Sequence, residues 1–296
     1  MFCKAKTIRS SSPVDRTVRA VCFVLMVLLS LTYVLMYLWL LLNSFRSLDS
    51  YLLNGFNLFD FKSYTLENYK ELFSTQIAGS ARHPVYITDT IVNTVVLVFG
   101  QVLLSISIPA FTAYIIAKYD FKLKKLITNL AVIVMVVPTL GSTATTYNFM
   151  TKLNLINTYR GVFLMSAGGF GFGFLLFFNF FAAIPWEYAE SAFLDGASDL
   201  QVFLRIMYPQ AVPIITAIAI TSFINRWNDY MTAYIYLPDN PTIALGVSQL
   251  YARMKNALTL PIAFAGMTLL ATVSLIIFAV FNKFIMNNLS VGGVKG

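Results

Sequence analysis

Long apolar runs alternate with short polar segments along the chain. Each run has roughly the 20 residues that a helix needs to cross a bilayer. The six runs lie at 21–42, 90–117, 126–150, 161–183, 213–237 and 261–282. They predict an all-α membrane protein in which a six-span domain, residues 21–282, lies between an N-terminal segment (1–20) and a C-terminal tail (283–296). The first run is too long for the apolar core of a signal peptide, which is roughly 7–15 residues, so we interpret it as a span.

The composition supports a membrane protein. Hydrophobic residues make up 58% of the chain and charged residues only 11%, whereas a soluble domain carries about 25% charged residues. The mean hydropathy is +0.72. One histidine and two cysteines, Cys3 and Cys22, offer no disulfide framework and no metal-ligand pattern, so we expect neither a metal site nor catalytic residues.

The basic residues predict the orientation. The net charge of +8 would raise nucleic acid as a partner of a soluble protein, but here the lysines and arginines cluster beside apolar runs. They are concentrated in 1–20 and in 118–125, and such clusters mark cytoplasmic segments. Both termini and the segment 184–212 are therefore expected in the cytoplasm, and the long loop 43–89 outside, with a short surface helix at LENYKELF (66–73).

The polar segment 184–212 has the pattern of helix–turn–helix. Pro185 suits the first position of a helix, and Gly196 lies where the helix end requires a C-cap. Ser198 with Gln201 forms a capping-box pattern that begins a second helix from Asp199 to about Tyr208. Pro209 and Pro213 are then expected to stop that helix. Periodicity alone leaves two interpretations open, a linker resting on its own bundle or a protrusion that fits a cytoplasmic partner.

The same stretch resembles the EAA motif of ABC-importer permease subunits. That motif reads Glu-Ala-Ala, three residues, Gly, nine residues, Ile, one residue, Leu-Pro. The matching positions here are Glu190, Ser191, Ala192, Gly196, Ile206, Tyr208 and Pro209. The spacing agrees throughout; Ser191 replaces Ala and Tyr208 replaces Leu, and the second change affects packing of the second helix. INTYRGV (156–162), FINRWNDYM (223–231) and SVGGVKG (290–296) further resemble the carbohydrate-uptake branch, similar to the maltose/maltodextrin permease.

The resemblance implies a function for the acidic segment. In such importers the EAA loop is a coupling helix that docks on a cytoplasmic ATPase, and closure of the ATPase dimer switches the pore between inward- and outward-facing states. The implied coupling residues are Glu187, Glu190, Ser191, Ala192, Asp195 and Gly196. The implied partners are a second homologous permease subunit, two ATPase subunits and an extracytoplasmic solute-binding protein. The chain itself would need no cofactor, because ATP and magnesium belong to the ATPase.

We expect the energy for transport to come from a separate ATPase and not from this chain. It lacks a GxxxxGK[ST] phosphate loop, and the glycine-rich SAGGFGFGF (166–174) is better explained by helix packing through Gly169 and Gly173. Ion-coupled carriers place ionisable groups within the membrane, but only the fifth run has any, Arg226 and Asp229. Spaced three apart on a helix, these two charges can neutralise each other.

NRWND (225–229) is the candidate substrate pathway. Polar side chains at this depth must face protein or a water-filled cavity. Asn225, Asn228 and Asp229 have the groups to hydrogen-bond sugar hydroxyls, and Trp227 can stack on a sugar ring. Contacts with neighbouring helices explain these residues equally well.

The main alternative is the same machine for another solute, such as a peptide, amino acid or polyamine. A secondary carrier or a polytopic membrane enzyme is a further alternative. The dense polar cluster at 187–205 has carboxylates but no His or Cys, which argues against an enzyme.

Overall fold

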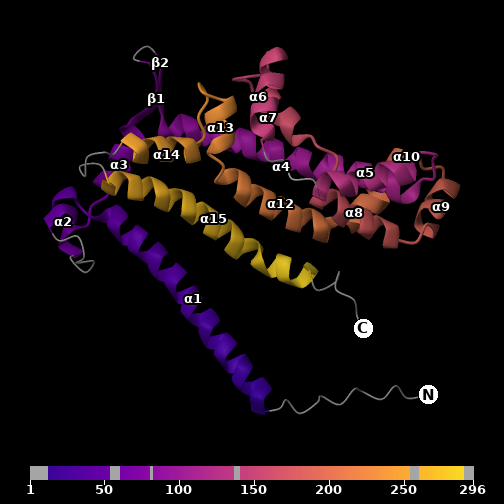
Figure 1. Ribbon diagram of the computed structural model, residues 1–296, viewed down its shortest axis with the longest axis horizontal. Helices are drawn as coiled ribbons and strands as arrows, with labels where there is room; N and C mark the ends of the chain where they lie inside the picture. Colours follow the sequence, from indigo (N-terminus) through magenta and orange to yellow (C-terminus); the bar gives the residue numbers. More distant parts are fainter. Residues whose placement is uncertain (1–12, 54–60, 81–82, 137–140, 254–259, 290–296) are drawn as a thin grey trace.

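The computed structural model describes residues 13–53, 61–80, 83–136, 141–253 and 260–289. These residues are mostly helical, with one small two-stranded hairpin (Figure 1). Most of the basic N-terminal segment and the terminal SVGGVKG lie outside the described residues.

Three long helices coincide with the first, second and sixth apolar runs. They are α1 (Pro13–Phe45), α4 (Ile87–Lys118) and α15 (Leu260–Leu289). Within the described residues these three are long and apolar enough to cross a membrane, and the number rises to five if each of two bent helix pairs is one span. The prediction of a helical membrane protein is confirmed, while the count of six spans and the side of the termini stay predictions.

The other three runs are helical in two pieces each. The third contains α5 (Lys124–Val136) and α6 (Ser142–Lys152), the fourth α7 (Tyr159–Ser166) and α8 (Phe172–Ala183), and the fifth α12 (Val212–Trp227) and α13 (Met231–Tyr236). The break in the fourth run falls on its glycines, and Gly171 has a φ of +142°, which non-glycine residues rarely adopt. Gly169 lies before α8 and Gly173 lies within it, so the prediction that these two glycines pack along one helix is wrong.

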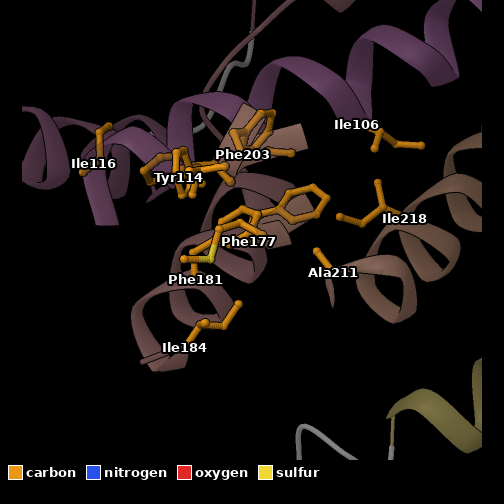
Figure 2. Packing of buried hydrophobic residues seen from close by; sticks show 14 of the residues in the cluster. Ile106, Tyr114, Ile116, Phe177, Phe181, Ile184, Phe203, Ala211 and Ile218 are labelled. Atoms are coloured by element: carbon orange, nitrogen blue, oxygen red, sulfur yellow. The ribbon is translucent and has the colours of Figure 1, made fainter. Parts of the chain in front are cut away.

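The largest core joins α4, α8, α12 and the polar segment 184–212 (Figure 2). Aromatic rings dominate it: Tyr114 of α4 lies 5.6 Å from the ring of Phe181 and 4.9 Å from that of Phe203. Phe177 and Phe181 of α8 are fully buried. The polar segment therefore packs into the bundle through this core.

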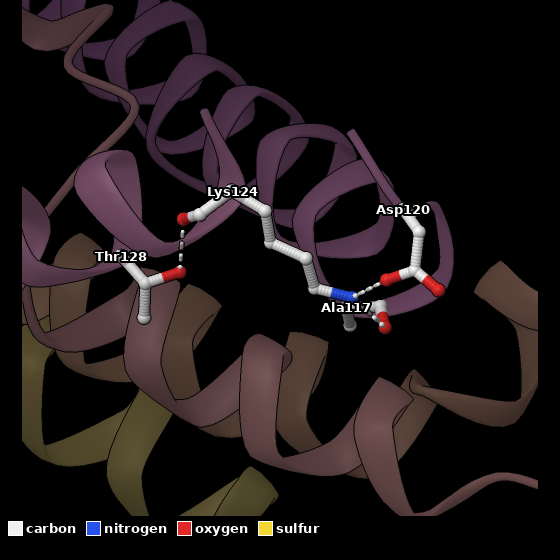
Figure 3. A network of polar contacts seen from close by, with 4 residues as sticks. All are labelled: Ala117, Asp120, Lys124 and Thr128. Carbon is white, nitrogen blue, oxygen red and sulfur yellow. Dashed lines mark hydrogen bonds and ion pairs between the residues drawn. The ribbon is translucent and has the colours of Figure 1, made fainter. Parts of the chain in front are cut away.

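The corner between α4 and α5 is held by polar contacts (Figure 3). The Nζ of Lys124 lies 2.9 Å from a carboxylate oxygen of Asp120 and donates to the backbone carbonyl of Ala117 at the end of α4. The Thr128 hydroxyl donates to the Lys124 carbonyl. A cation beside the last carbonyls of a helix offsets their partial negative charge, which stabilises this corner.

The described residues of the loop 43–89 form several short elements. They are α2 (Leu48–Leu53), a 3₁₀ turn (Phe61–Ser63), α3 (Glu67–Ser74) and the antiparallel strands β1 (Gln76–Ser80) and β2 (His83–Tyr86). The surface helix expected at LENYKELF is confirmed as α3, which buries Leu72 and Asn68. The hairpin was not predicted. With α14 (Ile243–Arg253), these elements cover one end of the bundle (Figure 1).

Helix α1 packs on α15 and α3 but diverges from the bundle towards its N-terminus (Figure 1). Large apolar side chains are exposed along most of it, for example Phe23 (68%) and Met36 (68%). This apolar surface suits lipid or another membrane subunit.

Candidate functional site

The first helix of the polar segment is α9 (Glu187–Leu194), and it ends as predicted at Gly196. The Gly196 N–H donates to the Phe193 carbonyl and the Ala197 N–H to the Ala192 carbonyl, which is the Schellman pattern. Gly196 has a φ of +82°. Pro185 lies two residues before the helix, so the prediction that it occupies the first helical position is wrong; Trp186 precedes α9 as its N-cap.

The second helix begins as predicted and ends differently. Ser198 and Gln201 form the capping box of α10 (Asp199–Val202), where the Ser198 N–H donates to the Gln201 side chain at 2.8 Å. Pro209 does not stop the helix, which continues through a π turn (Phe203–Met207) into α11 (Tyr208–Gln210). In the π turn the Tyr208 N–H donates to the Phe203 carbonyl, five residues back. This wider turn gives the proline ring room against the preceding turn, so the helix is not broken.

The polar segment presents charged and apolar groups together on its surface. Glu187, Glu190, Ser191, Asp195 and Gly196 are exposed. Leu194 is 90% exposed and Tyr188 53%, and each is next to a carboxylate in the sequence. Ala189 is fully buried and Ala192 is half-buried against the core, so both hold α9 to the bundle. An exposed apolar group ringed by charges is typical of a docking surface.

The end of α4 holds both helices of the segment. The Nζ of Lys118 donates to the Ile184 carbonyl just before α9, and the Tyr119 hydroxyl donates to an Asp199 carboxylate oxygen at 2.6 Å. Burial, together with the hydrogen bond to Asp199, raises the pKa of Tyr119 above its ordinary value, so the phenol stays a donor at neutral pH. Sequence reasoning did not identify these anchors, because they join residues 66 and 80 positions apart.

The polar segment meets the neighbouring helices at steep angles. The axis of α9 is bent by 72° from that of α8, and the stretch Asp199–Gln210 is bent by 74° from α12. Helices α9 and α10 thus lie across the end of the bundle opposite to α2 and α3 (Figure 1). Ala189 of α9 is part of the same buried core as residues of α4, α8 and α12.

The four residues of the candidate pathway separate in space. Asn225 is exposed and lines a cavity of about 550 Å³ bounded by α4, the α7–α8 break and α12. Trp227 is 5% exposed, stacks on Phe223 with centroids 5.7 Å apart, and donates its Nε1–H to the Leu270 carbonyl of α15.

The last two pathway residues make contacts within the protein. The Asn228 amide donates to the Ile224 carbonyl and to the Ser274 hydroxyl. Asp229 accepts from the Thr232 N–H and hydroxyl at 3.0 and 2.5 Å, at the start of α13. Only Asn225 of the four thus lines the large cavity, together with residues that sequence reasoning did not place there, Arg226 and Gly171 among them.

Comparisons with known proteins agree on one family. The model of the family "Binding-protein-dependent transport system inner membrane component" matches residues 105–290, more than half of the chain. The arabinooligosaccharides transport system permease protein AraQ of Halalkalibacterium halodurans is 30% identical over 260 residues, which cover 87% of this chain and 89% of that protein. The diacetylchitobiose uptake system permease protein NgcG of Streptomyces coelicolor is 26% identical, covering 97% and 92%.

The fold is also shared with a solved structure. A chain from the crystal structure of a bacterial ABC transporter involved in the import of the acidic polysaccharide alginate superposes with a TM-score of 0.74. The two chains are 19% identical, and the match covers 92% of this chain and 98% of the other. At this identity the similarity supports the fold.

Proposed function

The chain belongs to the family of binding-protein-dependent transport system inner membrane components, and we propose that its cargo is a saccharide. Membership makes it a multi-pass permease subunit of an ABC importer in the plasma membrane, not an enzyme. Relatives that match over nearly their whole length are named for arabinooligosaccharide and diacetylchitobiose uptake. The cavity beside Asn225 adds hydroxyl groups and aromatic rings, which suit sugars.

In the proposed topology the chain crosses the membrane six times between cytoplasmic termini. The spans are those of the sequence prediction, residues 21–42, 90–117, 126–150, 161–183, 213–237 and 261–282. The segment 184–212 then lies in the cytoplasm, where an ATPase can reach it, and the α2–β2 region lies outside.

The segment 187–196 is proposed to couple the permease to the ATPase. The observation that carries this step is α9 itself, an exposed acidic helix with Leu194 outward and Ala189 buried. Contacts from the end of α4 to Ile184 and Asp199 flank it on both sides. Because the anchors and the aromatic core leave α9 little freedom of its own, closing of an ATPase dimer would move α9 and the attached helices together. That movement would switch the pathway between inward- and outward-facing states.

The assembly follows from this role. It would contain a second homologous permease, two ATPase subunits and an extracytoplasmic solute-binding protein. ATP and magnesium would be bound by the ATPase, and no cofactor is proposed for this chain.

A reconstituted complex tests the proposal. The chain is purified with its co-encoded partners, placed in nanodiscs, and its ATPase activity is measured with a panel of loaded binding proteins. We expect stimulation by a saccharide-loaded protein, and loss of that stimulation in Glu190→Ala. Glu67→Ala is the matched control, because Glu67 is an exposed carboxylate on α3, away from α9.

Three outcomes would contradict parts of the proposal. Stimulation only by a binding protein loaded with an amino acid, peptide or polyamine would contradict the saccharide as cargo but not the role as a permease. A Glu190→Ala complex with full stimulation would remove the coupling role of that carboxylate. Uptake that needs neither ATP nor an associated ATPase would indicate a secondary carrier.

A further inference from the structure

The 550 Å³ cavity contains one charged side chain among its lining residues, that of Arg226. Its other polar groups are hydroxyls from α4, α7 and α12 and the amide of Asn225, and its apolar wall includes Phe172. Phe172 is 67% exposed, so its ring is accessible. The cavity therefore combines a fixed cation, neutral hydrogen-bonding groups and an aromatic surface.

Within the described residues, the charge that acts on the guanidinium of Arg226 is the carboxylate of Asp229. The guanidinium forms no hydrogen bond and no ion pair with the described residues. Asp229 is the nearby carboxylate, and both residues line a narrow void of about 10 Å³. The two Asp229 oxygens accept from Thr232, and no ion pair joins Asp229 to Arg226, so the two charges interact at longer range without direct contact.

Arg226 lies deep along α12. It comes 14 residues after Val212, about 21 Å along an α12 axis that rises 1.5 Å per residue. A cation this far along a membrane helix is costly and normally faces a counter-charge or water. Here it is half-buried at the cavity wall.

We infer that the cavity takes a saccharide that carries a carboxylate, a uronate, and that Arg226 pairs with it. A planar guanidinium binds a carboxylate through two parallel N–H···O contacts. One cation balances one carboxylate, whereas a phosphate with nearly two charges would call for a second cation, and Arg226 is the one charged side chain among the lining residues. The Asn225 amide and Ser222 hydroxyl form no hydrogen bond within the described residues and are available for sugar hydroxyls. The inference rests on the proposed saccharide permease and specifies its cargo.

Uptake of matched sugars into proteoliposomes that hold the complete transporter tests the inference. The probes are a uronic-acid oligosaccharide, its carboxyl-reduced neutral counterpart and a sugar phosphate, each presented at saturating binding protein. The variants are Arg226→Gln, Arg226→Lys and the control Arg160→Gln, which removes an exposed cation of α7 that is not a cavity residue.

We expect wild type and Arg160→Gln to import the uronate. Arg226→Gln should import it about 10- to 100-fold more slowly, the range for losing a hydrogen-bonded charge pair. Arg226→Lys should keep part of the activity, since it keeps the charge but not the planar fork. Any neutral uptake should change less than about twofold in Arg226→Gln.

The other outcomes overturn the inference in distinguishable ways. If wild type imports only the neutral sugar or the sugar phosphate, the cargo is wrong while the permease proposal stands. If Arg226→Gln slows uronate and neutral uptake equally, or Arg226→Lys is as poor as Arg226→Gln, Arg226 supports the fold or a gate instead. If no saccharide enters in wild type, the proposed function fails, and the inference with it.

Discussion

Replacement of Gly196 tests whether the end of α9 must keep its conformation for coupling. Its φ of +82° lies in the left-handed region, and no atom lies within 4 Å of where a Cβ would be. Gly196→Ala therefore creates no clash, and its cost is the backbone strain alone, about 1–2 kcal/mol. Asn tolerates this conformation better than Ala, so Gly196→Asn should cost less.

The consequence for coupling follows from that magnitude. A penalty of 1–2 kcal/mol changes the ratio of correctly to incorrectly formed helix ends by a factor of about 5–30. We expect Gly196→Ala to reduce ATPase stimulation by the loaded binding protein, with Gly196→Asn between it and wild type. The assay is stimulated and unstimulated ATPase activity in nanodiscs, together with the thermal midpoint of the complex.

Gly141 provides the matched control. It too is left-handed, with a φ of +80° and open space at its Cβ, but it precedes α6, away from α9. Gly141→Ala should lower the thermal midpoint about as much as Gly196→Ala and leave stimulation intact. Equal loss of stimulation in both variants, or none in Gly196→Ala, would refute a specific coupling role for this turn.

Three further substitutions and one change of pH have defined outcomes. Tyr119→Phe removes the 2.6 Å hydrogen bond to Asp199, so it should lower the free energy of unfolding by about 1 kcal/mol and weaken coupling. The control Tyr234→Phe changes an exposed tyrosine and should do neither. Thermal melts and stimulated ATPase activity measure the two effects. Because the pKa of Tyr119 is raised, its contribution should be complete below about pH 10 and be lost at higher pH; a melt that shows no such loss would contradict the assignment. Trp227→Ala should destabilise the protein by about 3–5 kcal/mol as a core truncation, seen as a lower thermal midpoint; an unchanged midpoint with a raised KM for uptake would return Trp227 to the substrate pathway. Leu194→Ser should leave the thermal midpoint unchanged and reduce co-purification of the ATPase, since Leu194 is 90% exposed; full retention of the ATPase would contradict docking there.

Local chemistry explains why parts of the fold were predictable. The capping box at Ser198 and the glycine end at Gly196 depend on neighbours within a few residues, and both formed as expected. The apolar runs likewise located every long helix, because backbone hydrogen bonding in a membrane leaves few alternatives. The π turn before Pro209 was not predictable in this way, since it is one of several means by which a helix can accommodate a proline.

Distant contacts explain what sequence reasoning missed at the site. Lys118 and Tyr119 look like the start of a basic loop, and only the folded chain brings them to Ile184 and Asp199. The glycine-rich stretch near Gly171 was assigned to packing because its apolar neighbours resemble a helix interior. In the fold those residues interrupt the helix and line the cavity instead.

The segment 225–229 shows the underlying reason. Consecutive residues of a helix point about 100° apart, so a run of polar residues must turn different side chains to different neighbours. In a soluble helix the apolar stripe reveals which face is buried, but α12 is apolar on nearly every face and gives no such reference. Residue chemistry alone therefore left two roles open for Trp227, a ring that stacks on a sugar or a contact with neighbouring helices. Packing against Phe223 and Leu270 places it in the core, and its neighbours Asn225 and Arg226 face the cavity. Within a membrane helix, a residue's chemistry suggests a role only once its direction is known.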